Sequence, residues 1–183
     1  AKNFKLVRTP LDAPGYANWE DVIAHRTETL LEGVDLFEDY LVLSERTNGL
    51  TQLRVKRWDG TADYYLAFED PAYVASVGAN PDFDTSTLRF HYNSMTTPSS
   101  VFQMDMASQE RELLKQQKVL GGKFDATNYS SERFMITARD GAQVPVSLVY
   151  KKGFEKGANR PMLLYAYGSY GYSLDPTFSS TRL

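Results

Sequence analysis

Four tyrosines fall within eight residues near the C-terminal end of the sequence, in the stretch YAYGSYGY (165–172). A phenol can donate a hydrogen bond to an oxyanion that develops during acyl transfer, a role more often filled by backbone N–H groups. The glycines and the serine between the tyrosines would let the backbone approach a substrate closely. Aromatic residues are also common at the ends of sheets, where the rings pack and the hydroxyls stay in water. The stretch therefore raises two hypotheses, an oxyanion-binding site and a packing element.

The elements that precede the tyrosines make this junction the best candidate for chemistry in the sequence, although the residues alone favour the packing element. The apolar run PMLLYAYG (161–168) is typical of a central strand covered on both faces, and ligands of open α/β sheets bind beyond the carboxyl ends of such strands. Residues 131–153 predict a hairpin, with Asp140 and Gly141 at its turn and apolar residues alternating along both arms. A hairpin that feeds a buried central strand is how an α/β-hydrolase sheet begins. We therefore expect such a domain to start at residue 129 and to occupy residues 129–183.

Other candidate groups are weaker. His25 and His91 could act as general bases, but neither has a serine or aspartate partner at a recognisable motif spacing, so we expect surface or structural histidines. No Gly-x-Ser-x-Gly nucleophile motif occurs in the 183 residues. The sequence has no cysteine, which excludes disulfides and thiolate metal ligands. No metal site and no cofactor are expected.

Composition and charge exclude several further classes. The net charge is −3 and the basic residues are spread along the chain, so no nucleic-acid partner is expected. No apolar run approaches the roughly 20 residues that a membrane-spanning helix needs, and no signal peptide is visible. The absence of cysteine favours a reducing compartment, and we expect a cytoplasmic protein.

Strand and turn signals dominate up to about residue 120 and repeat. Asn48-Gly49 and Asp59-Gly60 predict hairpin turns in a meander, and Leu88 and Val101 occupy the places that Leu41 and Thr51 hold one repeat earlier. The period of 47 to 50 residues with four short strands is typical of propeller blades. Residues 107–118 could form an amphipathic helix, but the repeat predicts a turn followed by an outer strand over residues 111–119. The fold class is therefore mainly β, with a partial β-propeller of about two and a half blades over residues 1–128.

Several long motifs resemble the prolyl oligopeptidase family of serine peptidases, and within it the oligopeptidase B branch. They are EGVDLFEDYLVLSERTNGLTQLRV, FEDPAYV, NSMTTPSSVFQMDM, ERFMITARDGAQVPVSLVY and YAYGSYGYSLDPTFSSTRL, and the resemblance covers essentially the whole chain. In that family a seven-bladed propeller caps an α/β-hydrolase domain and admits only short peptides. The resemblance implies that this chain comprises the last blades of the propeller and the first strands of the catalytic domain, with the remainder of both as its partners.

The resemblance also implies roles for three residues. Tyr167 matches the tyrosine of the family's Tyr-Gly-Tyr-Gly element, which donates its hydroxyl to the oxyanion hole; Ala166 replaces the intervening glycine here. Tyr170 matches an aromatic position close to the S1 region. Asp175 matches an acid that helps hold basic substrate groups, in enzymes that cleave short peptides after Arg or Lys. Thr177 stands where some members carry a second acid.

The family's catalytic Ser, Asp and His lie downstream of the matched region. We therefore expect the chain to be a fragment, and to be inactive by itself because an oxyanion donor has nothing to stabilise without an attacking nucleophile. The alternative is a β-propeller interaction module without hydrolytic activity, in which the tyrosines only pack. The hairpin and apolar run after the propeller favour the peptidase, since a binding propeller has no need of them.

Overall fold

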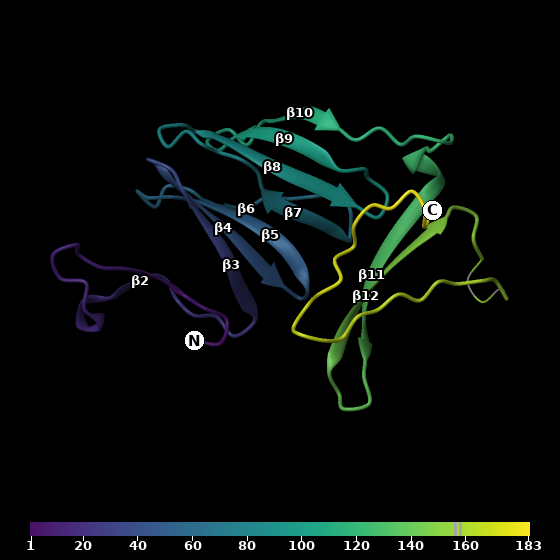
Figure 1. The fold of residues 1–183 in the computed structure, drawn as a ribbon, viewed down its shortest axis with the longest axis horizontal. Coiled ribbons are helices and arrows are strands. Elements are labelled where there is room, and N and C mark those ends of the chain that lie inside the picture. Colours follow the sequence, from purple (N-terminus) through teal and green to yellow (C-terminus); the bar gives the residue numbers. More distant parts are fainter. Residues whose placement is uncertain (156, 158) are drawn as a thin grey trace.

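The structure is a computed structural model that describes residues 1–155, 157 and 159–183. The fold is mainly β, with two four-stranded sheets at its centre, a two-stranded pair on one side and a long hairpin on the other (Figure 1). The strands are β1 (Leu6–Arg8), β2 (Glu20–Ile23), β3 (Thr29–Leu36), β4 (Tyr40–Thr47), β5 (Leu50–Arg57), β6 (Asp63–Tyr65), β7 (Tyr73–Val77), β8 (Thr87–Ser94), β9 (Ser100–Asp105), β10 (Arg111–Gln116), β11 (Tyr129–Thr137) and β12 (Gln143–Lys151). Two short 3-10 helices, η1 (Tyr16–Asn18) and η2 (Ala126–Asn128), complete the regular structure of the described residues.

The first four-stranded sheet is the predicted meander, in the order β3-β4-β5-β6 with all neighbours antiparallel. The turn between β4 and β5 has φ values of 50° at Asn48 and 73° at Gly49. Positive φ at both central residues defines the tight hairpin turn that the Asn-Gly pair predicts. The turn fixes the register, so that Val42 lies opposite Val55.

The second four-stranded sheet repeats the first, in the order β7-β8-β9-β10. Leu88 lies in the second strand of its sheet, as Leu41 does in the first, and Val101 and Thr51 lie in the third strands. The predicted repeat is therefore confirmed, and residues 111–116 form a strand rather than a helix. The described residues thus contain two complete blades and one half blade. The first blade is the sheet β3-β4-β5-β6, the second blade is the sheet β7-β8-β9-β10, and the half blade is the pair β1-β2.

The main core lies between the two blades. Along β8 the buried residues Leu88, Phe90 and Tyr92 alternate with the exposed Arg89 and His91, as expected of a strand with one covered face. The buried side chains belong to one cluster drawn from both sheets: Phe37, Tyr40, Val42, Leu53, Val55, Leu66, Tyr73, Ala75, Leu88, Phe90, Tyr92, Met104 and Met106. At about 1.5–3 kcal/mol for each large apolar side chain removed from water, this cluster is the main force that stacks the blades.

The other face of the first blade carries a smaller core. Leu31, Leu41 and Leu43 pack there with Ile23 of β2. Strand β4 therefore contributes Leu41 and Leu43 to one face and Val42 to the opposite face, which explains the unbroken apolar run at its start. The pair β1-β2 belongs to this core and forms the half blade on the left of Figure 1.

Strands β11 and β12 form the predicted hairpin, paired from Tyr129↔Lys151 to Thr137↔Gln143. The predicted central strand over residues 161–168 is wrong for this structure. No residue of that segment is in a strand, and Leu163 and Leu164 are 72% and 79% exposed. The physical reason is that a central strand needs hydrogen-bonding partners, and no described strand lies in register with this segment. The charge and the glycine of residues 154–160 predict a surface loop, and this stretch lies partly outside the described residues.

Candidate functional site

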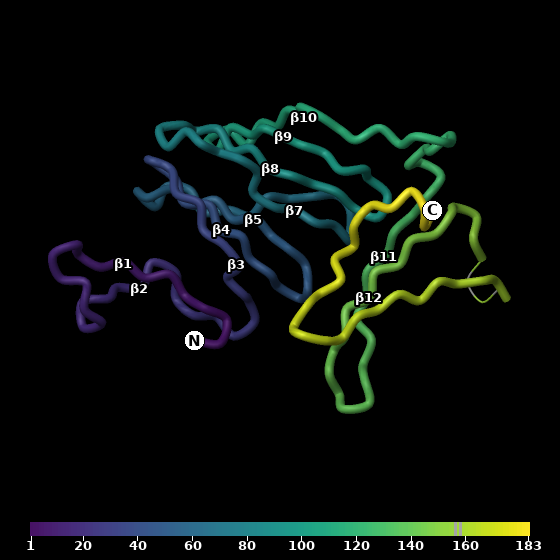
Figure 2. The backbone as a smooth tube through the Cα atoms, viewed as in Figure 1, coloured from purple at the N-terminus to yellow at the C-terminus, as the bar shows by residue number. Residues whose placement is uncertain are grey.

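The tyrosine segment (residues 165–172) follows the hairpin and precedes a return of the chain to the blades. The tube in Figure 2 shows this part of the chain in yellow, passing from the β11-β12 hairpin toward the ends of the blade strands. The segment turns sharply at residues 169–172, where the Tyr172 N–H donates to the Ser169 carbonyl at 3.1 Å. Tyr170 and Gly171 have φ values of 53° and 66°. A bulky residue at positive φ is strained, and such strain is concentrated at functional sites.

The turn exposes the phenol rings rather than packing them. Tyr170 lies at the tip and is 97% exposed, and Tyr167 is half exposed. The Tyr167 ring meets the Tyr172 ring edge-on, with centroids 5.8 Å apart, and Tyr165 lies under the Arg182 guanidinium at 4.5 Å. The tyrosines are therefore ordered partly by each other, and the rings of Tyr167 and Tyr170 are open to a ligand.

Asp175, the third residue predicted to act at the site, is bound by the first blade. Arg46 at the end of β4 donates from Nη1 to Asp175 Oδ1 at 2.6 Å and from Nη2 to Oδ2 at 3.2 Å. The two bonds form a planar fork, the strongest arrangement between these side chains. The side chains are only 16% and 25% exposed, so water screens the pair weakly. The structure thus brings Asp175 to a cation of the same chain.

Arg46 is itself held from two other sides. Its Nε donates to Glu32 Oε1 at 2.6 Å, and Nη1 also donates to the Gly49 carbonyl at 3.2 Å. Glu32 is the extra residue of a bulge in β3, between the pairs Leu31↔Glu45 and Gly33↔Ser44. Because a bulge re-aims side chains, it explains how a strand residue reaches Arg46. The hydrogen bond to Asp175, followed by that to Glu32, raises the pKa of Arg46 further above its already high value.

The β4-β5 turn beside Arg46 contacts the hairpin. Arg133 of β11 donates from Nη2 to the Asn48 carbonyl and from Nη1 to Ser147 Oγ at 3.0 Å. Gly49 lies so close that a Cβ there would be 3.0 Å from Pro145 Cγ. Burial lowers the pKa of Arg133, and the charge of Asp175 opposes that shift. The first blade therefore touches both the hairpin and the end of the tyrosine segment.

The chain after Asp175 is anchored to the second blade. Pro176 is buried, and the Phe178 N–H donates to Asn93 Oδ1 of β8 at 3.1 Å. The Phe178 ring packs edge-on against Phe124, with centroids 5.1 Å apart. Residues 175–178 thus span both blades, directly after the exposed tyrosines.

The two histidines lie elsewhere. His25 is exposed between β2 and β3, and His91 is exposed in β8. Within residues 1–155, 157 and 159–183, no three His, Asp or Glu side chains converge as metal ligands would. In the same part of the chain, no helix has the length and apolar character needed to cross a membrane.

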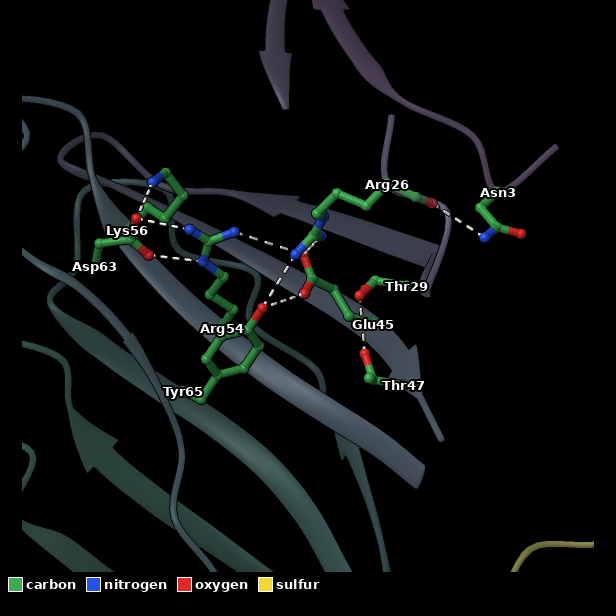
Figure 3. A network of polar contacts seen from close by, with 9 residues as sticks. All are labelled: Asn3, Arg26, Thr29, Glu45, Thr47, Arg54, Lys56, Asp63 and Tyr65. Carbon is green, nitrogen blue, oxygen red and sulfur yellow. Dashed lines mark hydrogen bonds and ion pairs between the residues drawn. The ribbon is translucent and has the colours of Figure 1, made fainter. Parts of the chain in front are cut away.

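Sequence reasoning missed a second polar cluster, which lies on the first blade (Figure 3). Glu45 of β4 is fully buried, and its carboxylate accepts hydrogen bonds from Arg26 and from the Tyr65 hydroxyl, the latter at 2.7 Å. Arg54 lies 4.0 Å from Glu45 and forms a fork with Asp63, at 2.7 Å for both bonds. Burial, followed by the bond to Glu45, raises the pKa of Tyr65.

This cluster is suited to structure rather than to catalysis. The Glu45 carboxylate is bound by donors on both oxygens, and Arg26 also donates to the Tyr65 hydroxyl at 3.1 Å. Because these groups satisfy one another, the cluster offers no free base to a substrate. No local pattern marks Glu45 as buried, since it lies between Ser44 and Arg46 in the polar half of β4. Arg46, Glu32 and Arg133 were missed in the same way, since their partners are distant in sequence.

The sequence is similar to a known protein family and to individual peptidases. A family described as "Prolyl oligopeptidase, N-terminal beta-propeller domain" matches residues 1–117. Dipeptidyl aminopeptidase BI from Pseudoxanthomonas mexicana is 45% identical over 184 aligned residues, which cover 100% of this chain and 25% of that protein. Protease 2 from Moraxella lacunata is 32% identical over 183 residues, with 100% and 26% coverage.

Solved structures match over nearly the whole chain. Oligopeptidase B from Trypanosoma brucei, in a closed form with covalently bound antipain, superposes with a TM-score of 0.87 and 36% identity over 97% of this chain and 26% of that one. Oligopeptidase B from Leishmania major gives a TM-score of 0.84 and 32% identity, with the same coverage. The chain spans about a quarter of the length of the relatives it matches. The match to the solved structures extends beyond residue 117 into the hairpin and the tyrosine segment.

Proposed function

The chain belongs to the prolyl oligopeptidase family of peptidases, and we propose that it is part of a serine peptidase that cleaves short peptides after arginine or lysine by acyl transfer. The observation that carries the proposal is the likeness to oligopeptidase B structures at 36% and 32% identity over 97% of the chain. The matched region includes the tyrosine segment as well as the blades. The lack of cysteine is compatible with the reducing cytoplasm, where we place the protein.

We assign residues 1–128 to the propeller and residues 129–183 to the start of the catalytic domain. The boundary is supported by the change from four-stranded blades to the separate β11-β12 hairpin, which begins at Tyr129. The propeller would restrict access to the active site, and the residues after the hairpin would enter the site.

Tyr167 is the proposed oxyanion donor. Its phenol is half exposed and its ring is fixed on one side by Tyr172, so the hydroxyl can reach a bound carbonyl. As an activated serine attacks that carbonyl, negative charge grows on the oxygen, and a hydrogen bond aimed there stabilises the transition state more than the ground state. The nucleophile and its base come from outside residues 1–183, so we expect this segment alone to be inactive.

Tyr170 and Asp175 are the proposed substrate contacts. The fully exposed ring of Tyr170, at the tip of a strained turn, offers an apolar face to the side chain next to the scissile bond. Asp175 adds a carboxylate on the same segment, but Arg46 already compensates its charge. Selection of basic residues therefore depends mainly on acids other than Asp175.

The test uses the full-length protein that carries this sequence and a short peptide with arginine before the scissile bond. Tyr167→Phe should lower kcat by about 10²–10³ with little change in KM, because only the transition state uses the lost hydrogen bond. Tyr172→Phe is the matched control, since it removes a neighbouring hydroxyl and keeps the ring that contacts Tyr167. Equal, small effects of both variants would make Tyr167 a packing residue. An inactive parent would favour an interaction module.

A second candidate is release of dipeptides from free N-termini. It is favoured by the 45% identity to a protein named dipeptidyl aminopeptidase BI. Substrates that differ only by acetylation of the N-terminal amine separate the two activities. An endopeptidase should cleave both, whereas a dipeptidyl aminopeptidase needs the free ammonium group and should lose the acetylated one.

A further inference from the structure

We propose that Arg46 is a positioning residue for the tyrosine segment, which it holds against the first blade through Asp175. The carboxylate that the family resemblance assigns to substrate then serves mainly to join the two parts of the chain. This inference rests on the proposed function, because the segment matters for catalysis only if Tyr167 does.

The first argument is the occupancy of Asp175. Each of its oxygens accepts a bond from Arg46, at 2.6 and 3.2 Å, and the partners are 129 residues apart in sequence. A cationic substrate group that took both oxygens would have to displace a guanidinium that is also bound to Glu32 and to the Gly49 carbonyl. Arg46 is therefore fixed before substrate arrives, as a structural group would be.

The second argument is the place of Asp175 along the chain. After β12 ends at Lys151, no described residue up to Leu183 lies in a strand. Asp175, Pro176 and Phe178 are the points where this length of chain returns to the blades. Asp175 comes three residues after Tyr172, whose ring supports Tyr167. Loss of the Arg46 contact should therefore let the tyrosines shift, and a misplacement of about 1 Å can cost about 10² in rate.

The third argument is charge. Glu32 and Asp175 both accept hydrogen bonds from the one Arg46 guanidinium. Without Arg46, Glu32 and Asp175 would lose the cation that both now bind, with only the Arg133 charge left near Asp175, and like charges in such a site repel. Arg46→Met should therefore lower kcat more than Asp175→Asn does. The Asp175→Asn variant removes one of the two negative charges and leaves Arg46 paired with Glu32.

The test measures kcat and KM of the full-length protein on two peptides that both carry arginine before the scissile bond. They differ in the preceding residue, which is arginine in one and alanine in the other. Arg46→Met should lower kcat at least about tenfold on both peptides alike. Arg46→Lys keeps the charge without the fork and should be intermediate. Arg54→Met is the matched control, because Arg54 forms a similar fork with Asp63 on the same blade, with side chains 19% and 38% exposed, and should leave kcat within about twofold of the parent.

A second readout does not depend on activity. Hydrogen exchange of the peptides that cover residues 172–178, where the Tyr172, Thr177 and Phe178 N–H groups donate hydrogen bonds, should accelerate in Arg46→Met and not in Arg54→Met. Unchanged exchange in Arg46→Met would overturn the proposal. The proposal would also be overturned if Asp175→Asn raised only the KM for the Arg-Arg peptide while Arg46→Met lowered that KM. Asp175 would then be a substrate subsite. If the parent protein proves inactive, the proposed function fails while the exchange result still decides whether Arg46 holds the segment.

Discussion

Replacement of Arg26 by methionine should loosen the first blade far more than its partial exposure suggests. Arg26 precedes β3 and donates to the fully buried carboxylate of Glu45 and to the Tyr65 hydroxyl (Figure 3). Without Arg26, Glu45 keeps only the Tyr65 hydroxyl at 2.7 Å and Arg54 at 4.0 Å. A buried carboxylate would then have lost its nearest cation while remaining out of water.

The magnitude follows from burial. Removing one partner of a fully buried ion pair costs about 3–5 kcal/mol. The Arg26 side chain is 32% exposed and Glu45 retains two partners, so we expect a cost at or below the lower end of that range, about 2–3 kcal/mol. The control is Arg8→Met, since Arg8 and Glu20 form a pair at 2.8 Å with side chains 75% and 66% exposed. Such a surface pair contributes about 0–1 kcal/mol.

The assay is native-state hydrogen exchange of the full-length protein, because a multidomain protein does not give one free energy of unfolding from a thermal midpoint. Amides of β3 and β4 in Arg26→Met should exchange roughly 30- to 150-fold faster, which corresponds to about 2–3 kcal/mol at about 1.4 kcal/mol per factor of ten. Amides of β1 and β2 in Arg8→Met should change by less than about fivefold.

A further variant isolates the cause. If the cost arises from an uncompensated buried charge, then Glu45→Leu on the Arg26→Met background should restore most of the protection, because apolar replacement of a buried pair is often neutral. Exchange in Arg26→Met that rises no more than in Arg8→Met would refute the reasoning. Faster exchange of the β3 and β4 amides in the Arg26→Met/Glu45→Leu double variant than in Arg26→Met alone would also refute it.

Two further predictions test other contacts. Gly49→Ala and Gly141→Ala both place a side chain at positive φ, a strain of about 1–2 kcal/mol, but only the Gly49 variant also crowds Pro145, at 3.0 Å. Gly49→Ala should therefore accelerate hydrogen exchange of the β4 and β5 amides more than Gly141→Ala accelerates that of the β11 and β12 amides, and equal accelerations would count against a tight contact between blade and hairpin. The hydrogen bond from Arg54 holds the pKa of Asp63 below its ordinary value of 3.8. Its stabilisation is present above about pH 4 and is lost as the pH falls through the lower folded pKa, so exchange of β5 and β6 amides should be less acid-sensitive in Asp63→Asn than in the parent.

The blades could be predicted because their signals are local. Asn48 and Gly49 both take the positive φ values that the turn requires, and the alternation of Leu88, Phe90 and Tyr92 defines the buried face of β8. A charged outer strand such as β10 was predictable only from the repeat, since its residues are all exposed and its composition resembles that of a helix. Turn residues and hydrophobic periodicity are thus enough to predict the fold up to and including the β11-β12 hairpin.

The site could be predicted only in part. The apolar run over residues 161–168 predicts a strand by composition, but strand formation depends on a partner that composition does not reveal. The contact between Arg46 and Asp175 joins residues 129 positions apart, and neither residue carries a local signal for the other. Glu45 lies in the polar half of β4, and its burial is explained only by Arg26, which precedes β3, and by Arg54 of β5.

These limits bear on how the tyrosines could act. An oxyanion donor must hold its hydroxyl within about 0.5 Å of the productive position, yet Tyr167 and Tyr170 lie in exposed chain outside any strand. Their rigidity must therefore come from the ends of the segment rather than from its own hydrogen bonds. On the C-terminal side the support comes from the blades, through Arg46 and Asn93. If Tyr167 acts in catalysis, a propeller of this kind contributes to the geometry of the active site as well as to access, and substitutions on a blade strand such as β4 should alter kcat without touching the substrate.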